Sequence, residues 1–261
     1  MNLPRIVMNP NPQAESPFNG LLLVDKPYGY TSHDVVADVR YALKIKKVGH
    51  AGTLDPMATG LLIIMLGKAT RLFDQLSGSN KTYEGMFTLG VKTDSGDLDG
   101  RIESLIEPPQ VSREQIDTAF ERFSGTYMQT VPSYSAVKIK GKKAYAMARQ
   151  GLEFKRPSRS VKIKDFECLN IHEDDIWFRV HVSTGTYVRA LVEDVAKELG
   201  TIATLSSLRR IDIGDKKIER ALTVQDVKRM SQAEVLAHMI PISEALPQPK
   251  NDFAFQPAGT Q

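Results

Sequence analysis

Cysteine is almost absent from this chain of 261 residues, and Cys168 is the only one. A lone thiol cannot close a disulfide within the chain, and no Cys/His cluster has the spacing of a zinc site. Disulfide-stabilised secreted scaffolds and zinc modules are therefore excluded. Because disulfides belong to oxidising compartments, we expect a cytoplasmic protein.

Long hydrophobic runs are also missing. The longest spans Leu61–Leu66, six residues, whereas a membrane-crossing helix needs about 20. The first 17 residues mix proline, asparagine and polar side chains without an apolar core, so they do not form a signal peptide. We expect no membrane association.

Several catalytic motifs are lacking as well. The sequence has no glycine-rich phosphate loop ending in Lys-Ser/Thr, no dinucleotide fingerprint and no Gly-x-Ser-x-Gly. The acidic turn 94–100 resembles a calcium loop, but its twelfth position is Ile106, where a carboxylate is required. Nucleotide-driven, triad-type and metal chemistry thus lose support, and we expect no metal and no organic cofactor.

Net charge is small, +3, but it is unevenly distributed. The segment from Lys138 to Lys164 holds ten basic residues and only Glu153 as an acid, which gives it +9 and leaves −6 for the remainder. Such clustering suits a polyanion, because each phosphate that is neutralised releases counterions. The alternative is a solvated loop with spare lysines.

Hydrophobic periodicity predicts an α+β fold with a mixed, largely antiparallel sheet flanked by helices. We expect an irregular stretch over 125–143 and antiparallel pairing of 161–171 with 176–182. The predicted strands cover 21–24, 61–66, 81–92, 161–171, 176–182 and about 208–213. The predicted helices cover 32–43, with Ser32 as N-cap, and 69–76, 112–123, 143–150, 187–199 and parts of 223–239.

Asp55 stands out within the loop 49–60, where three glycines allow other groups to approach the backbone closely. Pro56 follows it and favours an extended backbone, and the apolar run 61–66 would anchor the loop to a sheet. A carboxylate that only stabilises a turn is the simpler interpretation. The surroundings favour a side chain displayed at a sheet edge.

Six sequence blocks, in this order, resemble the TruB family of tRNA pseudouridine-55 synthases. The similarity runs from about Gly20 to Ala245. The blocks are GHAGTLDPMATGLL (49–62), GKATR (67–71), KTYEG (81–85), QTVPSYSAVK (129–138), GTYVR (185–189) and LSSLRR (205–210).

The resemblance implies a pseudouridine synthase fold and the isomerisation of uridine 55 in the T-loop of tRNA. The base must first flip out of its stack, at a cost of a few kcal/mol. The implied catalytic residues are Asp55, as nucleophile or as proton acceptor from the ribose, Arg189, as partner of its charge, and Tyr83, which stacks on the uracil. From the sequence alone, Arg189 could instead pair with Glu193 one helical turn away.

Substrate contacts follow from the same resemblance. His50 would fill the place of the flipped base, and Tyr187 and Leu208 would line the base pocket. The basic segment falls in the family's tRNA-gripping insertion, here 125–160, and the implied contacts are Lys138, Lys142 and Lys143. The expected partner is the T-stem-loop of tRNA, bound by a monomer without an obligate protein partner.

The resemblance also predicts a domain layout, and it leaves alternative functions open. We expect a flexible leader (1–19), a catalytic domain (20–246) and a short tail (247–261) without the complete C-terminal RNA-binding domain of many relatives. An RNA-folding chaperone could coexist with the enzyme. A nucleoside hydrolase using one aspartate, or a relative that works with a guide RNA, are weaker alternatives.

Overall fold

The computed structural model describes residues 17–246 apart from 136, 140, 149, 151 and 153, and the side chains of 138, 143, 145 and 146 are outside that description. The predicted tail 247–261 and most of the predicted leader therefore lie outside the described residues. Within the described part, none of the helices has both the length and the hydrophobicity that crossing a membrane requires.

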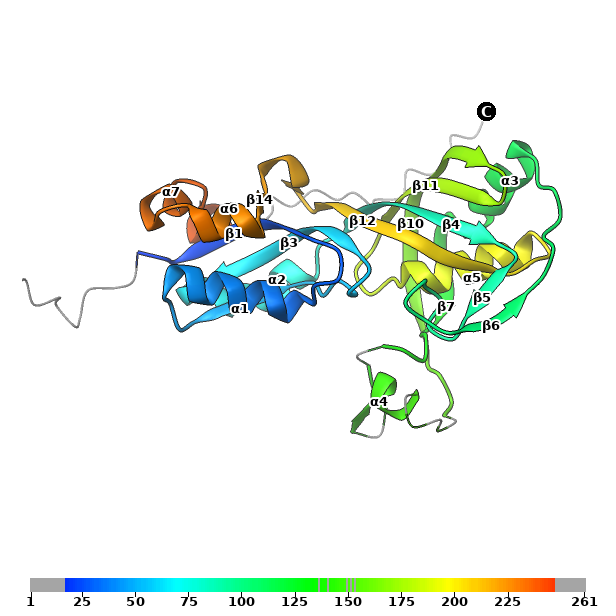
Figure 1. The fold of residues 1–261 in the computed structure, drawn as a ribbon, viewed down its shortest axis with the longest axis horizontal. Coiled ribbons are helices and arrows are strands. Elements are labelled where there is room, and N and C mark those ends of the chain that lie inside the picture. The colour runs from blue at the N-terminus through cyan, green and yellow to red at the C-terminus, as the bar shows by residue number, and fades with distance from the viewer. Residues whose placement is uncertain are drawn as a thin grey trace, which may run out of the picture.

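The chain alternates strands and helices along its whole described length (Figure 1). The strands are β1 (Gly20–Lys26), β2 (Val48–Ala51), β3 (Thr59–Leu66), β4 (Lys81–Leu89), β5 (Val91–Thr93), β6 (Ile102–Leu105), β7 (Gly125–Thr130), β8 (Lys138–Ile139), β9 (Lys142–Lys143), β10 (Ser158–His172), β11 (Asp175–Val182), β12 (Ala203–Ile213), β13 (Lys216–Lys217), β14 (Leu222–Thr223) and β15 (Ile240–Pro241). The helices are α1 (Ser32–Leu43), α2 (Phe73–Ser77), α3 (Arg113–Phe123), α4 (Ala144–Ala148), α5 (Val188–Glu198), α6 (Val224–Arg229) and α7 (Gln232–Ala237), with short 3-10 helices η1 (Gly67–Leu72), η2 (Ile218–Arg220) and η3 (Ile242–Glu244).

One large sheet organises the molecule, in the order β14-β1-β3-β12-β4-β11-β10-β7. The pairs β1–β14 and β3–β12 are parallel and the other neighbours in this order are antiparallel. The predicted mixed, largely antiparallel α+β fold is thus confirmed. Strand β12 joins the two halves of the sheet, because it pairs with β3 on one side and β4 on the other.

The half built on β1 and β3 is covered on both faces. Leu62, Ile64 and Leu66 pack with α1 and α6, whereas Leu61 and Ile63 pack with residues of η1 and α2. This two-sided burial explains why 61–66 reads as a continuous apolar run rather than as an alternating strand.

The other half packs helices α3 and α5 against β4, β11 and β10 (Figure 1). Its core contains the rings of Phe87, Phe120 and Phe178 together with the apolar side of α5. The predicted antiparallel pairing of 161–171 with 176–182 is confirmed by the β10–β11 ladder.

The stretch 125–143 is less irregular than expected. Its first part forms β7, which pairs antiparallel with the beginning of β10. In β7 only Gln129 is buried, and this leaves no apolar alternation from which a strand could be recognised. Figure 1 shows α4 on an extension that hangs away from the sheet.

The N-cap of helix α1 lies one residue earlier than predicted. Thr31, not Ser32, accepts the N-cap hydrogen bond from the Asp34 backbone N–H. The hydroxyl of Ser32 is buried and bonds to Leu54 instead, so it holds the Asp55 loop rather than the helix end.

Candidate active site

Asp55 lies in the loop between β2 and β3, at the junction of the two halves of the sheet. Its carboxylate is 44% exposed and faces a cavity of about 860 Å³. That volume is near the upper end of the range for small-molecule sites, about 300–1,000 Å³. The lining residues come from the Asp55 loop, α2, β4, the acidic turn 94–101, the segments 134–135 and 182–189, and β12.

Two buried cations, Lys26 and Arg210, hold the Asp55 loop. The ammonium of Lys26 donates to the carbonyl of Pro56 at 3.2 Å and also to the carbonyls of Pro27 and Tyr30. The guanidinium of Arg210 donates to the carbonyls of Gly52 and Leu61, at 2.8 Å each. These bonds fix the backbone on either side of the carboxylate, which gives the loop the rigidity that a catalytic side chain needs.

Close packing at Gly60 completes the anchor. Its φ is +102°, and a Cβ atom there would lie 2.3 Å from the carbonyl oxygen of Arg210 on the paired strand β12. Only glycine combines this backbone conformation with so close an approach.

Arg189 is the cation nearest to Asp55. Its Nε lies 3.0 Å from Oδ2 of Asp55 and 3.4 Å from Oδ2 of Asp97, and its side chain is only 6% exposed. The other guanidinium nitrogens donate to the carbonyls of Ser95 and Tyr134. Among the described residues Arg189 pairs with these acids rather than with Glu193, which was the alternative from helical spacing.

The cavity wall contains three more of the predicted residues. Tyr83 and Leu208 are each 8% exposed, and they line the cavity beside Asp55. Tyr187 precedes α5 and also lines it. The buried Gln129 side chain exchanges two hydrogen bonds with the backbone of Tyr187. The guanidinium carbon of Arg159 lies 5.5 Å from the centroid of the Tyr187 ring.

His50 lies on β2, just before the loop, and does not line the cavity itself. Burial, the neighbouring His33 and Arg210 lower the pKa of His50 to about 4, so its ring is neutral at physiological pH. Nδ1 is buried and makes no hydrogen bond to any residue that the structure describes. A buried ring nitrogen without a partner is unusual in a protein on its own.

Of the three lysines predicted to contact RNA from the insertion, the structure describes the side chain of Lys142 alone. Lys142 is exposed, and the side chains of Lys138 and Lys143 lie outside the described residues. The backbones of Lys138 and Lys143 are paired in the β8–β9 ladder.

Sequence reasoning missed several residues of the site. Lys26, Ser32, Arg210 and Gln129 support the loop and cavity from the interior, and Asp97 shares Arg189 with Asp55. Arg210 belongs to the quoted block LSSLRR, but nothing in the spacing of that block indicates which of its arginines points inward. Asp97 belongs to the acidic turn 94–100. The local pattern of this turn suggested only a calcium loop, and that interpretation was rejected because the twelfth position is Ile106.

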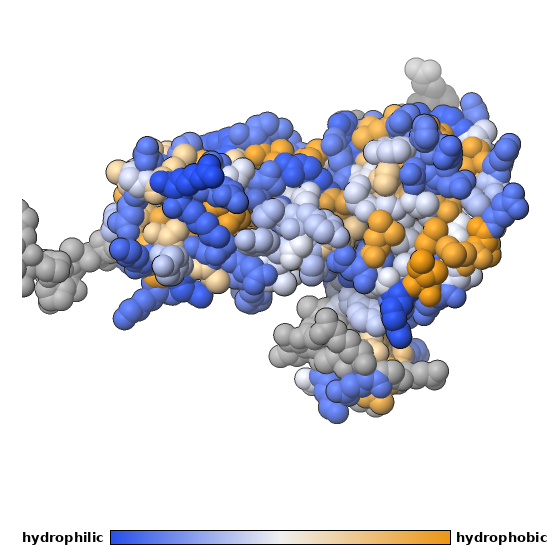
Figure 2. Space-filling view, in the orientation of Figure 1, coloured by the Kyte–Doolittle hydropathy of each residue, from blue (hydrophilic) through white to orange (hydrophobic). Residues whose placement is uncertain are grey.

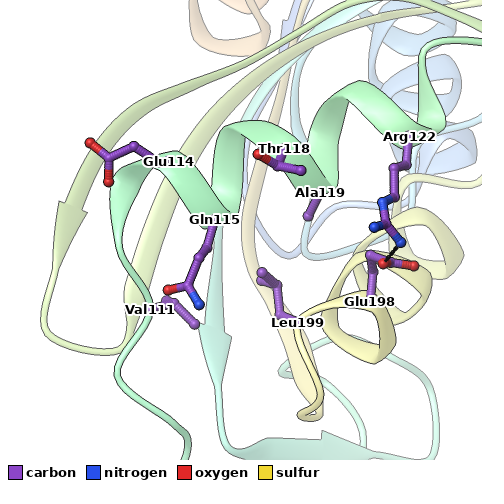
Figure 3. Close-up of a pocket in the computed structure, with 8 residues that line it drawn as sticks. All are labelled: Val111, Glu114, Gln115, Thr118, Ala119, Arg122, Glu198 and Leu199. Atoms are coloured by element: carbon purple, nitrogen blue, oxygen red, sulfur yellow. Dashed lines mark hydrogen bonds and ion pairs between the residues drawn. The ribbon is translucent and has the colours of Figure 1, made fainter.

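A second cavity, of about 300 Å³, lies between α3 and the end of α5 (Figure 3). It is lined by Val111, Glu114, Gln115, Thr118, Ala119, Arg122, Glu198 and Leu199, none of which is a predicted site residue. Among the described residues, no group of three or more His, Cys, Asp or Glu side chains could hold a metal ion.

Comparisons with known proteins find similar sequences over most of this chain. The sequence is 41% identical over 235 residues to tRNA pseudouridine synthase B of Opitutus terrae. The alignment covers 90% of this chain and 98% of that relative. It is 44% identical to the protein of the same name from Geobacillus thermodenitrificans, over 87% of this chain and 78% of that one.

A solved structure of a Cbf5-Nop10-Gar1 complex contains a chain of similar fold, with a TM-score of 0.69 and 30% identity. The alignment covers 88% of this chain and 62% of that one. Residues 40–188 match the family described as TruB family pseudouridylate synthase (N terminal domain). The chain therefore belongs to the TruB family of pseudouridylate synthases.

Proposed function

We propose that this chain converts uridine 55 in the T-loop of tRNA into pseudouridine. The observation that carries the proposal is the ion pair of Asp55 and the buried Arg189 at a cavity large enough for a nucleotide. The curated relatives named tRNA pseudouridine synthase B support tRNA as the substrate class.

The chemistry is an isomerisation and is balanced within the substrate. The bond from uracil N1 to ribose C1′ breaks, the base rotates, and C5 bonds to C1′; C5 loses a proton and N1 gains one. Asp55 either attacks the sugar or takes a ribose proton, and both roles require its ionised form. The guanidinium of Arg189, 3.0 Å away, is the ion-pair partner of this carboxylate. Neither redox chemistry nor phosphate energy enters, so the proposal needs no cofactor.

The neighbouring side chains fit the handling of a flipped base. Tyr83 supplies an aromatic face beside Asp55, and Tyr187 and Leu208 supply further walls. The neutral ring of His50 can occupy the gap in the RNA stack without the desolvation penalty that a charged imidazole would pay.

We further propose that residues 20–246 form the catalytic domain and that the insertion 125–160 grips the stem-loop through Lys138, Lys142 and Lys143. The charge of the segment 138–164 supports this, because A-form RNA is read mainly through its shape and backbone. In this proposal the protein acts in the cytoplasm as a monomer.

The test is tritium release from a T-stem-loop transcript that carries 5-³H-uridine, using the purified chain alone. We expect release by the wild type and none by Asp55→Asn, which keeps the side-chain shape but cannot act as nucleophile or base. Retained RNA binding by Asp55→Asn would assign the loss to chemistry. Absence of release by a folded, RNA-binding wild type would contradict the proposal, and free uracil as product would indicate a hydrolase.

A further inference from the structure

Helix α1 connects the Asp55 loop to a distant part of the surface. At its start, the Ser32 hydroxyl accepts a hydrogen bond from the Leu54 N–H at 3.0 Å. The ring of His33 lies edge-on to that of His50, with the centroids 5.2 Å apart. One end of α1 is thereby attached to the candidate active site.

One face of α1 stays exposed along its length. His33, Ala37, Tyr41 and Lys44 follow one another at spacings of three or four residues, and Arg40 is three residues after Ala37. All five are exposed, and we call them the α1 stripe. At 1.5 Å per residue, the stripe runs about 16 Å from His33 to Lys44. It ends in a groove of about 600 Å³ lined by Ala37, Arg40, Tyr41, Ala42, Lys44 and Lys228.

The charge around this groove is positive. From Val39 to Leu54 the sequence contains no acidic residue, whereas Arg40, Lys44, Lys46 and Lys47 are basic. The carboxylate of Asp38, on the same helix, is 2.7 Å from the ammonium of Lys228 and is thereby neutralised.

Tyr41 lies among these cations with 85% of its surface exposed. The face over α1 and α6 is largely hydrophilic, with smaller apolar areas between the polar ones (Figure 2). A protein-docking surface would be expected to have a larger apolar centre. Cations with one aromatic ring on a polar face are instead the groups that bind a nucleic-acid backbone.

We propose that the α1 stripe binds the sugar-phosphate backbone of the RNA stem that carries the substrate loop. The stripe starts beside His50, so a loop that enters the cavity places its stem within reach. Its length of about 16 Å is enough to follow several nucleotides of the stem backbone. This site is separate from the basic insertion and depends on the proposed function only in that the substrate is RNA.

The experiment compares two hairpins with the same loop, one with a stem of about three base pairs and one with about ten, over about 50 to 200 mM salt. The variant is Arg40→Ala/Lys44→Ala. The control is Arg113→Ala/Arg122→Ala, which removes two positive charges from exposed positions of α3, in the other half of the molecule. Alanine is a good helix former at Arg40, Arg113 and Arg122, and at the C-cap position Lys44 it replaces another residue that has a Cβ atom.

We expect the α1 variant to bind the long hairpin on the order of tenfold more weakly than the wild type at low salt. The slope of log affinity against log salt concentration should become shallower by the equivalent of about two phosphate contacts. Binding of the short hairpin should be unchanged, and so should turnover of the short hairpin at saturating RNA. Tyr41→Ala should also weaken only the long hairpin.

Three results would overturn the inference. They are wild-type affinity of the α1 variant for the long hairpin, an equal loss with both hairpins, and an equal loss in the α3 control. Because binding is measured without turnover, these outcomes remain distinguishable from a failure of the proposed isomerisation, which would appear as a lack of tritium release by the wild type.

Discussion

The double role of Arg189 leads to a prediction that separates folding from catalysis. Its guanidinium compensates two carboxylates: Asp55, which is 44% exposed, and Asp97, which is 7% exposed. In Arg189→Met the half-exposed Asp55 can be solvated by water, whereas Asp97 loses its cation in a buried site. Breaking a buried pair in this way costs about 3–5 kcal/mol, a large part of the total stability of about 5–15 kcal/mol.

A second change should restore part of that loss. The Oδ1 atom of Asp97 accepts hydrogen bonds from the Ser95 hydroxyl and the Asp99 backbone N–H, and an asparagine oxygen can accept the same bonds. Arg189→Met/Asp97→Asn leaves no uncompensated charge, so we expect it to be about 1–3 kcal/mol more stable than Arg189→Met alone. Tritium release should stay absent in both variants, because the cation beside Asp55 is missing in both.

Urea unfolding provides the free energies, and an exposed ion pair provides the control. Arg113 and Asp117 are 2.8 Å apart on α3 and about half exposed, so Arg113→Met should cost no more than about 0.5 kcal/mol. A loss of stability in Arg189→Met as small as in this control would refute the compensation of Asp97 by Arg189. No recovery on adding Asp97→Asn would refute it as well.

Three further predictions concern the surroundings of the cavity. Burial lowers the pKa of Lys81 to about 8, so between about pH 8 and 10 the unfolded chain binds more protons than the folded chain. The stability of the wild type should therefore rise with pH relative to that of Lys81→Met, by up to about 1.4 kcal/mol per pH unit. Parallel curves of stability against pH would contradict this. Gly60→Ala should destabilise more than Gly125→Ala in thermal unfolding, because both have positive φ but only Gly60 is blocked by the Arg210 carbonyl; equal losses would contradict the steric argument. Tyr83→Phe should keep the RNA affinity that Tyr83→Ala loses, since stacking on a base is worth about 1–3 kcal/mol, and similar affinities of the two variants in filter binding would argue against a stacking role.

Most of the helices and strands could be predicted from local sequence patterns. The run 61–66 can be recognised as a strand because it is short, apolar and buried on both faces, and 176–182 because its burial alternates. Strand β7 was missed because five of its six residues are not fully buried, so it depends on pairing with β10, a partner some 30 residues away. Short-range patterns carry no information about such pairing.

For the candidate site, the sequence by itself determined the loop of Asp55, the family to which the chain belongs, and the positive charge of the segment 138–164. Only the tertiary structure decided that Arg189 compensates Asp97 as well as Asp55, and that Lys26 and Arg210 hold the loop from the interior. The reason is physical: these contacts join residues more than 25 positions apart, and whether a lysine or arginine is a buried anchor or a solvated surface charge depends on the packing around it.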